Sequence, residues 1–566
     1  MTMTSLKETA FITHPSLSFV SVSFLLCLLA VAPRPSFFPL VFLLSSLQLY
    51  GRIIVRREHA FANFSRLWAA LTTAVVLSHI GPALSALSTP STSIIFLTLS
   101  AATTSFVALS AILMDIKVCS KTKSQWSQIT LFPALWASVW ALAAHISPVG
   151  RLATWSPLRG LPLDIWITRW IGVPALDWLT AACSVVITEA VGDWYIGTAP
   201  RRMNTITGDD ESEILPGLPT RREPPTKSPV PRSYPVLGLC GLILAVTVPS
   251  YVSSPLPLPP YSKVTTPLTV ACVLPPRHRA RNWPPSLDDY IKESKRLTQA
   301  KVLIWPEGAV RFDSPAERAE AIEKVQKDVA WTNHYVGVSF EEVVSSNDEK
   351  TKKRNGFVLV NKTGPVLEYY KRHLVPVAES FSLSPSTDPP TVYTLPLTKP
   401  NDFTKSQWGN VTRPIPLTAS ICLDFSDPYA FSALPSKPAL ILAPARTWDQ
   451  SVGLTMFEHA KARAAELDSM VLWCDGGSGG VSGIVGRGMH EMMQVGHGSW
   501  TRTVGIQYPF DDRKTVFMAG GEGVGLMGMW ALHGVMWFGA LGGVLSSRLA
   551  RLREARRVNE EAPLLG

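Results

Sequence analysis

VLEYYKRHLVPVAE, residues 366–379, is the stretch on which the interpretation of the whole chain rests. It places Lys371 between an aromatic pair, Tyr369 and Tyr370, and the segment Arg-His-Leu-Val-Pro. Most lysines lie on solvated surfaces, but these aromatic and aliphatic neighbours favour partial burial. A buried ammonium group needs carboxylate partners, and Glu379, eight residues further on, and Glu307 are the candidates.

The composition of the chain points to a membrane protein. Hydrophobic residues make up 46% of the 566 residues, and charged residues make up only 17%. The formal net charge of +10 is typical of proteins that bind anionic partners such as nucleic acid or anionic lipid. Because the lysines and arginines fall beside the apolar segments, we expect membrane lipids as partners and no nucleic acid.

Apolar segments of nearly membrane-spanning length fill the first half of the chain, and one more lies near the C-terminus. The first two are short and separated by Pro-Arg-Pro, so they form either a tight hairpin or one re-entrant element. The segments are roughly 16–32, 35–51, 65–84, 92–114, 128–147, 170–191, 233–253 and 523–546.

The distribution of basic residues predicts the orientation of these segments. Lysines and arginines gather in alternate loops and in the C-terminal tail, which places the N- and C-termini in the cytoplasm. The expected domains are a transmembrane domain of about seven helices (1–253), containing a disordered cytoplasmic loop (198–232), an extracytoplasmic domain (254–522), a transmembrane helix (523–547) and a basic cytoplasmic tail (548–566).

Residues 264–517 have a different character from the segments around them. Short β-rich runs such as KVLIWPE (301–307) and SMVLWCD (469–475) alternate with amphipathic helical patterns such as 314–332 and 455–467. Strands that alternate with helices indicate an α/β sheet domain.

The seven cysteines form no CxxC pair and no cluster with histidines. We therefore expect neither a zinc site nor a disulfide framework, and no metal or other cofactor. A cysteine with a special role is then a nucleophile.

Two residues besides Lys371 stand where catalytic groups are found. Glu307 follows an apolar run, and partial burial there would raise its pKa and make it a base near neutral pH; the alternative is a helix cap or a surface turn. Cys422 lies in the strand-like run TASICLDF, where a small buried hydrophobe is the alternative. Asp424 shares its strand face if that strand continues.

Taken together, Trp-Pro-Glu307, Tyr-Lys371-Arg-His-Leu-Val-Pro with Glu379, and Ile-Cys422-x-Asp424 resemble the carbon–nitrogen hydrolase (nitrilase) superfamily. The chain is most similar to its membrane branch, apolipoprotein N-acyltransferase, along most of its length. The resemblance implies a multi-pass helical membrane domain and an extracytoplasmic α/β nitrilase-like domain, an αββα sandwich. It also implies that Glu307 is the general base, that Lys371 stabilises the oxyanion and that Cys422 is the nucleophile.

Further residues match the family or depart from it. Trp448 resembles the tryptophan that follows the cysteine strand, and His459 and Arg463 lie in a pattern similar to that of the next helix. Glu379 is expected to hold Lys371. The family usually carries glutamate where this chain has Asp424, and the asparagine often found before the tryptophan is absent.

Three functions follow as hypotheses. The first is a membrane N-acyltransferase of the type used in lipoprotein biosynthesis: a phospholipid acyl chain forms a thioester on Cys422 and passes to an amine such as a protein or peptide N-terminus. The second is a membrane-anchored amidase or nitrilase-type hydrolase with water as acceptor. The third is an inactive nitrilase-fold binding protein, for which Asp424 is the only support.

Other motifs give weaker evidence about function. Residues 523–528 fit GxGxxG but open an apolar segment, and the glycine-rich stretch 476–486 is interpreted as a turn near the site. Asp177 and Glu189, in or beside the sixth span, are either functional or interface acids. The sequons at Asn361 and Asn410 and the acidic dileucine pattern at 560–565 hint at a eukaryotic endomembrane protein.

Overall fold

The computed structural model describes residues 13–534, apart from 55–58, 123, 162–165, 197–232, 254–257, 259, 261, 263, 277–283, 331–332, 345–351, 400–407, 409–411 and 487–488. The predicted loop 198–232, the tail 548–566 with its dileucine pattern, and the sequon at Asn410 lie outside these residues.

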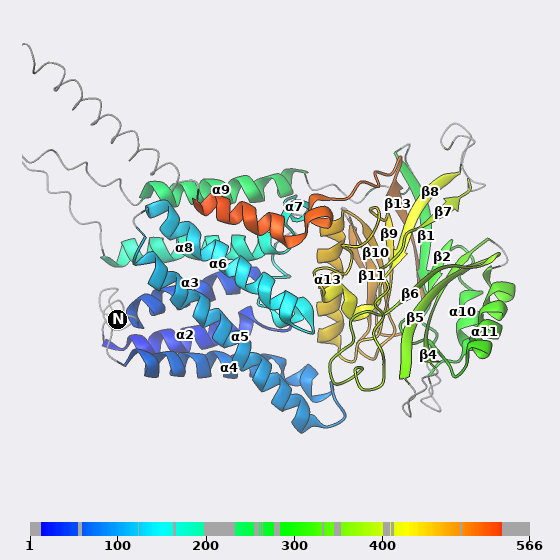
Figure 1. Cartoon of the computed structure of the whole chain (residues 1–566), viewed down its shortest axis with the longest axis horizontal. Helices are drawn as coiled ribbons and strands as arrows, with labels where there is room; N and C mark the ends of the chain where they lie inside the picture. The colour runs from blue at the N-terminus through cyan, green and yellow to red at the C-terminus, as the bar shows by residue number, and fades with distance from the viewer. Residues whose placement is uncertain are drawn as a thin grey trace, which may run out of the picture.

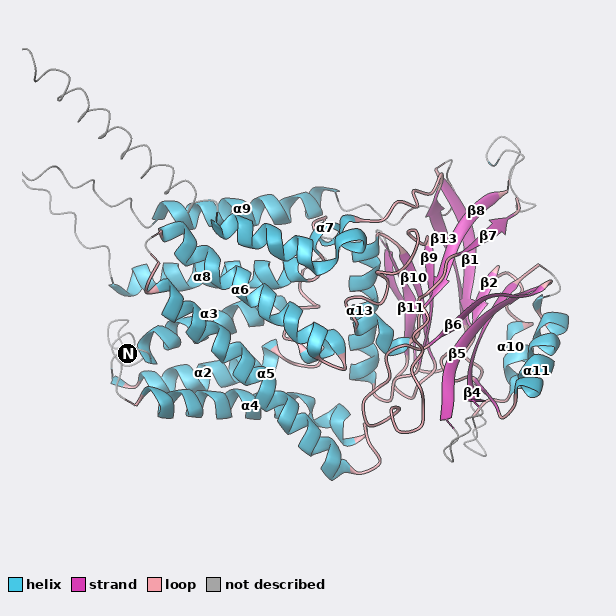
Figure 2. Ribbon diagram, in the orientation of Figure 1, coloured by secondary structure: helices cyan, strands magenta, loops and turns pink. Residues whose placement is uncertain are grey.

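Antiparallel apolar helices form one end of the molecule, as Figures 1 and 2 show. Six of them are long and apolar enough to cross a membrane, which is consistent with a multi-pass membrane protein. The first helix, α2, is shorter, and it packs with α3 as a hairpin of two separate helices. The helices are α2 (Pro15–Ala30), α3 (Phe37–Ile54), α4 (Ala60–Leu84), α5 (Pro90–Cys119), α6 (Gln125–Ile146), α8 (Pro174–Ile196) and α9 (Ser233–Ser253).

A C-terminal helix packs against the same bundle. It begins at residue 516, earlier than the 523 expected from hydropathy, and is described as far as residue 534. Its neighbour is α6, because Trp126 Nε1 donates to Leu532 O at 3.1 Å and Trp530 Nε1 donates to Ser138 Oγ at 2.9 Å. The rest of the predicted span 523–547 lies outside the described residues.

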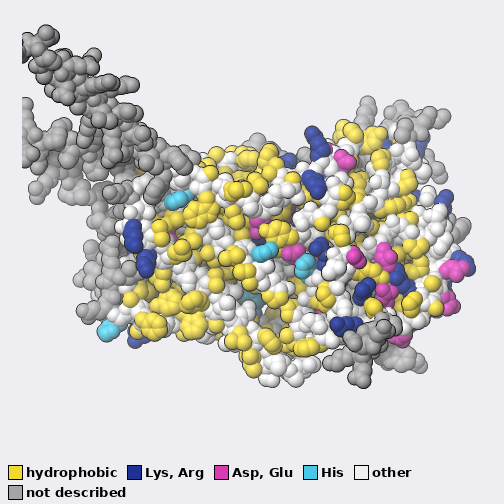
Figure 3. Space-filling model, viewed as in Figure 1, with side chains coloured by type: hydrophobic (Ala, Val, Ile, Leu, Met, Phe, Trp, Pro, Cys, Tyr) yellow, Lys and Arg dark blue, Asp and Glu magenta, His cyan; other side chains and the backbone are white. Residues whose placement is uncertain are grey.

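The bundle presents an apolar surface. Hydrophobic side chains cover most of the bundle half in Figure 3, whereas acidic and basic side chains are more frequent on the other half. Large side chains such as Phe61, Ile95, Phe96 and Leu99 on α4 and α5 are more than half exposed. A water-facing surface of this kind is unfavourable, so lipid is its natural solvent.

The other end of the molecule contains two mixed β-sheets. The first has the order β13-β1-β2-β4-β5-β6, with β3 beside β4, and the second has the order β12-β11-β10-β9-β8-β7. The strands of the first sheet are β1 (Thr265–Cys272), β2 (Val302–Ile304), β3 (Val310–Phe312), β4 (Tyr335–Val344), β5 (Lys352–Asn361), β6 (Gly364–Tyr370) and β13 (Trp500–Gln507). The strands of the second are β7 (Tyr393–Leu397), β8 (Arg413–Ala419), β9 (Leu440–Ala445), β10 (Met470–Asp475), β11 (Val481–Gly486) and β12 (Met489–Val495).

Helices cover the outer faces of the two sheets. One hydrophobic cluster fills the space between the sheets, and a second lies between the first sheet and the helices α10 (Leu287–Ser294) and α11 (Pro315–Asp328). The helix α13 (Gln450–Leu467) covers the second sheet on the side of the membrane helices (Figure 1). The central strands β1, β2 and β4 run parallel, and β1 and β2 are buried along almost their whole length, as a strand covered on both sides requires.

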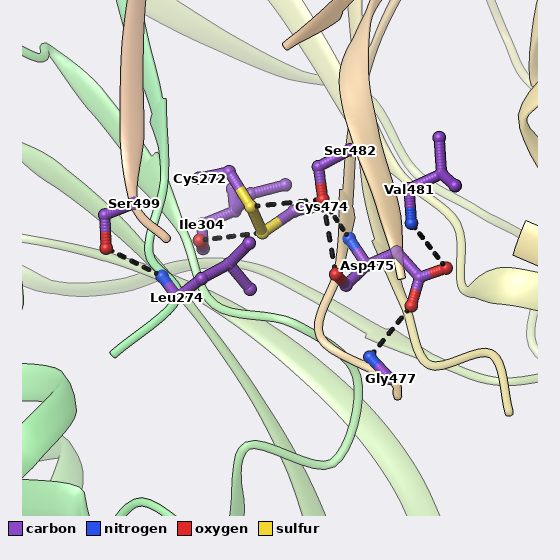
Figure 4. Close-up of a disulfide and its surroundings, with 9 residues drawn as sticks. All are labelled: Cys272, Leu274, Ile304, Cys474, Asp475, Gly477, Val481, Ser482 and Ser499. Carbon is purple, nitrogen blue, oxygen red and sulfur yellow. Dashed lines mark hydrogen bonds between the residues drawn. A yellow bond between two sulfur atoms is a disulfide. The ribbon is translucent and has the colours of Figure 1, made fainter. Parts of the chain in front are cut away.

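A disulfide joins the two sheets. Cys272 of β1 and Cys474 of β10 are bonded across a separation of 202 residues, and both are fully buried (Figure 4). The expectation of no disulfide was wrong, because two cysteines so far apart in sequence show no spacing that reveals the pairing. The bond fixes one sheet against the other directly beside Ile304, the last residue of β2.

Removing this disulfide will lower the stability of the two-sheet domain. A crosslink that closes a loop of this length reduces the entropy of the unfolded chain by an amount worth about 5 kcal/mol in the chain-entropy model. We expect Cys272→Ala/Cys474→Ala to unfold at a clearly lower temperature in thermal melts of the full chain in detergent. Cys240→Ala, which changes a free and half-buried thiol, is the control. Equal melting temperatures for the two variants would contradict the prediction.

The helix α13 forms the seam between the two halves. Its Thr455 Oγ1 donates to Pro33 O, in the α2–α3 turn, at 2.8 Å. At its other end the Glu466 carboxylate accepts the backbone N–H of Val173, before α8, at 2.9 Å. The sheet domain is therefore bonded to the membrane helices at both ends of one helix.

A second contact joins the halves through two short 3-10 helices. These are η2 (Gly150–Ala153), which follows α6, and η4 (Cys422–Ser426), which follows β8. Gly150 has φ +57, and a Cβ there would lie 2.4 Å from Ser426 O. Only glycine allows η2 to approach η4 this closely, so the turn that contains Cys422 lies directly on the membrane side.

Candidate active site

Glu307 lies in the loop after β2 of the first sheet, and this loop contacts the second sheet. Its backbone N–H donates to Ala445 O of β9 at 3.3 Å, so the loop is held between the sheets. The carboxylate is buried, and its Oε1 accepts Asn355 Nδ2 at 2.6 Å and Lys371 Nζ at 2.7 Å. Burial raises the pKa of Glu307 to about 7, although the charge of Lys371 acts in the opposite direction. This carboxyl group can therefore exchange a proton near neutral pH.

Lys371 follows the last residue of β6 and is fully buried. Its backbone N–H donates to Asn355 O of β5 at 2.9 Å, which continues the strand pairing by one residue. Its Nζ reaches Glu307 at 2.7 Å and Glu379 at 2.8 Å. Burial alone would lower the pKa of Lys371, but the neighbouring Glu307, Cys422 and Glu379 outweigh it, and the net shift is upward. The ammonium charge is therefore permanent under physiological conditions.

Cys422 begins the turn η4 and does not lie in a strand. The strand β8 ends at Ala419, so placing Cys422 in a strand was wrong, and the condition for Asp424 to share a strand face with it is not met. Cys422 has φ 45, in the left-handed region that non-glycine residues rarely adopt. Such a conformation costs ~1–3 kcal/mol and occurs often at active sites. The apolar run TASICLDF concealed this turn.

The ionisation of the Cys422 thiol is influenced by groups on either side of the site, namely the carboxylate of Glu307 and the backbone N–H of Arg446. Burial and the charge of Glu307 raise the pKa of the thiol well above its usual value, whereas Lys371 lowers it. The resting group is thus a neutral thiol beside a carboxylate.

Glu379 and Asp424 hold the lysine segment. Glu379 accepts Lys371 Nζ through Oε1 and the backbone N–H of Val375 at 2.8 Å through Oε2. Asp424 is completely buried and accepts the backbone N–H groups of Arg372 and His373 at 3.2 and 2.8 Å. Although aspartate is shorter than glutamate, its carboxylate reaches the segment that carries Lys371.

Trp448 lies away from these groups. Its side chain is 38% exposed, and its Nε1 donates to Pro82 O near the end of α4 at 3.1 Å. Trp448 therefore adds a contact between the sheet domain and the membrane helices and does not touch Lys371 Nζ or the Glu307 carboxylate in any described hydrogen bond.

Three contributors were not foreseen from the sequence. Asn355 and Arg446 touch Glu307 and Cys422, and His373 contacts Asp424 through Nδ1 at 3.0 Å. Asn355 lies between Arg354 and Gly356 of β5, just before the apolar run 357–360, so its sequence context is polar; its 3% exposure shows that it is buried with a partner. The Arg446 contact uses the backbone, so no side-chain pattern indicates it.

Within the described residues, no group of three or more His, Cys, Asp or Glu side chains is arranged to hold a metal ion.

Searches with known proteins give a likeness only at the level of structure. No family model and no curated protein matches the chain. An amidase from Nesterenkonia sp. AN1 matches with 18% identity and a TM-score of 0.29 over 43% of this chain and 93% of that chain. A mutant of this amidase, described as belonging to the nitrilase superfamily, matches with 17% identity and a TM-score of 0.29 over 43% and 91%. The structural neighbours are thus nitrilase-superfamily amidases, and the site geometry has to carry any argument about activity.

The reactivity of Cys422 will depend on the ionisation of Glu307. With a pKa of about 7, Glu307 loses its ability to accept the thiol proton as the pH falls below that value. We expect alkylation of Cys422 by iodoacetamide to slow by about tenfold per pH unit below this point. Peptide mass spectrometry separates Cys422 from the other free cysteines. In Glu307→Gln the alkylation rate should be low at every pH and should not fall about tenfold per pH unit below about pH 7. The same decline in the variant as in the wild type would contradict the role of Glu307 as base.

Proposed function

We propose that the protein is a membrane-bound N-acyltransferase that takes an acyl chain from a phospholipid and passes it to an amine. The observation that carries the proposal is the contact of a buried thiol with a carboxylate base, beside a permanent ammonium charge, on a turn that rests against the membrane helices. The similarity of the sequence around Lys371 to apolipoprotein N-acyltransferases supports the same conclusion.

In the first half-reaction Glu307 accepts the Cys422 proton while the sulfur attacks the ester carbonyl carbon of the lipid. The tetrahedral oxyanion is stabilised by Lys371, a contribution of ~3–4 kcal/mol for a well-placed donor. When the intermediate collapses, the C–O bond breaks and Glu307 returns the proton to the leaving lysophospholipid oxygen. The product is a Cys422 thioester.

In the second half-reaction an amine attacks the thioester carbonyl. Glu307 accepts a proton from the amine nitrogen while Lys371 again stabilises the oxyanion. The C–S bond then breaks, and Glu307 gives that proton to the departing sulfur, so the products are an amide and the free Cys422 thiol. The acceptor is proposed to be a protein or peptide N-terminus. If water replaces the amine, the same groups catalyse hydrolysis, which is the activity of the alternative hydrolase.

The location of the site supports a lipid donor. A cavity of about 100 Å³ lies at the seam, lined by Val75 and His79 of α4, Leu97 and Thr104 of α5, and Arg151 of η2. Thr455 and His459 of α13 line it as well, and η2, which also lines it, is the element that packs on the turn of Cys422. This position favours substrates from the bilayer over soluble amides. The pairing of Lys371 with Glu307 at 2.7 Å, in a site where Glu307 and Cys422 influence each other's ionisation, favours an enzyme over the alternative of an inactive binding protein.

Intact-mass analysis after incubation with phospholipid tests the proposal. We expect an added acyl group on the wild-type protein, its removal by an amine acceptor, and no adduct on Cys422→Ala. Cys240→Ala is the matched control and should be acylated as fast as the wild type. The absence of an adduct with any phospholipid, together with turnover of soluble amides, would favour the hydrolase.

We further propose that residues 254–522 lie outside the cytoplasm. The buried Cys272–Cys474 disulfide is typical of an oxidising compartment, and the distribution of basic residues supports the same placement. Cells lysed into an alkylating reagent should yield Cys272 and Cys474 as a disulfide-linked peptide pair and Cys240 as an alkylated peptide. Full alkylation of all three would contradict the placement.

A further inference from the structure

His373 occupies an unusual position between two carboxylates. It follows Lys371 by two residues, and its ring is about one-third exposed. Its Nδ1 lies 3.0 Å from Asp424 Oδ1, and its Nε2 lies 3.4 Å from Asp427 Oδ2. A neutral imidazole has only one N–H, so one ring nitrogen would turn a lone pair toward a carboxylate oxygen. The doubly protonated imidazolium is the form that satisfies both contacts.

The two carboxylates belong to the turn that carries the thiol. Asp424 is the third residue of η4, and Asp427 is the residue that ends it. Besides the histidine ring and two backbone N–H groups of the lysine segment, Asp424 accepts Tyr369 OH at 2.7 Å and the backbone N–H of Ile421 at 3.1 Å. The carboxylate therefore joins the end of β6 to the start of η4.

We propose that protonated His373 is a positioning residue: by bridging Asp424 and Asp427 it holds the Lys371 segment on the Cys422 turn, and its deprotonation loosens that contact. The Lys371 segment is then connected to η4 at two points. Asp424 is bonded to the backbone N–H groups of residues 372 and 373, and Asp427, at the end of η4, contacts the imidazole. Lys371 is the residue immediately before this link, and Cys422 is the first residue of η4. The effect on catalysis rests on the proposed function, whereas the effect on stability does not.

The charged groups around His373 set the direction of its titration. Burial lowers the pKa of His373, but the hydrogen bond and charge of Asp424 and the charge of Asp427 raise it, and the net shift is upward in spite of the nearby Arg372. Arg372 is itself directed to the backbone, because its Nη1 donates to Ala430 O at 3.1 Å. With a raised pKa in the folded state, the stabilisation is complete below the usual value of about 6.5 and is lost as the pH rises through the folded value.

Two neighbouring groups keep their protons over this interval, because the pKa of Lys371 is raised and the pKa of Tyr369 is raised by burial and by Asp424. Glu307 titrates near 7, and its raised pKa also lowers the stability of the fold as the pH rises, while its ionisation increases Cys422 reactivity. The contribution of His373 is therefore the difference between the pH profile of the wild type and the profiles of variants that alter only the His373 contacts.

Two variants separate positioning by charge from simple packing. His373→Gln keeps a polar side chain but removes the charge. Asp427→Asn leaves every Asp424 contact in place and removes only the carboxylate at Nε2, so the histidine should titrate at a lower pH. For each protein we would measure the melting temperature in detergent and the rate of Cys422 thioester formation with phospholipid, from about pH 5.5 to pH 9, with iodoacetamide alkylation of Cys422 as a readout that needs no lipid.

We expect His373→Gln to melt below the wild type at about pH 6 and to approach it at about pH 9, with thioester formation slowed by at least about tenfold at the lower pH. Asp427→Asn should retain the alkaline decline but shift it to lower pH. The proposal would be overturned if the melting temperature of His373→Gln differed from that of the wild type by the same amount at every pH. It would also be overturned if the alkaline decline of Asp427→Asn occurred at the same pH as in the wild type. If His373→Gln fails to fold, the shift in Asp427→Asn decides the question. If no thioester forms with any lipid but the melting curves show the shift, the proposed function fails and the positioning role stands.

Discussion

The buried ammonium group of Lys371 is the charge on which the arrangement of the site depends. Placing an ion in a protein interior costs several kcal/mol, which only close counter-charges and hydrogen bonds offset. Glu307 and Glu379 supply those charges from the loop after β2 and from the segment after β6, at 2.7 and 2.8 Å. Because two carboxylates surround one ammonium, the site carries an excess negative charge, which helps to keep the pKa of Glu307 high and the thiol of Cys422 neutral. The same constraint that stabilises the lysine therefore keeps the Glu307 carboxyl group titrating near neutral pH.

Buried charges also connect this site to the membrane helices. Arg463 and Glu466 form an ion pair of 2.8 Å on α13, and the Glu466 carboxylate also accepts the N–H of Val173. Arg151 of η2 is paired with Glu522 of the C-terminal helix. Breaking a buried pair of this kind costs about 3–5 kcal/mol, because one partner stays charged and unpaired. Rigid attachment of α13 and η2 therefore fixes the position of the Cys422 turn relative to the apolar helix bundle.

The sequence allowed some of these features to be predicted and hid others for identifiable reasons. Lys371 with Glu307 and Glu379, and the alternation of strands and helices, followed from local patterns: an apolar setting around charged residues, and periodic apolar runs. The disulfide did not, because pairing over 202 residues depends on how two sheets stack. The turn at Cys422 did not either, since hydrophobic residues pack around a 3-10 helix as readily as along a strand. Trp448 was assigned by resemblance, and its ring instead donates to Pro82 O at the membrane helices.

The aspartate at position 424 shows how the turn and the lysine segment depend on each other. A carboxylate at the third position of a short helix reaches back to the N–H of the residue before the helix when its side chain is short, and Asp424 bonds Ile421 in this way at 3.1 Å. That bond opposes the strain of the left-handed Cys422 between them. The same carboxylate is bonded from the opposite side by the backbone of residues 372 and 373. The strained thiol and the buried ammonium are thus held by one group, so neither can move without weakening the bonds that position the other.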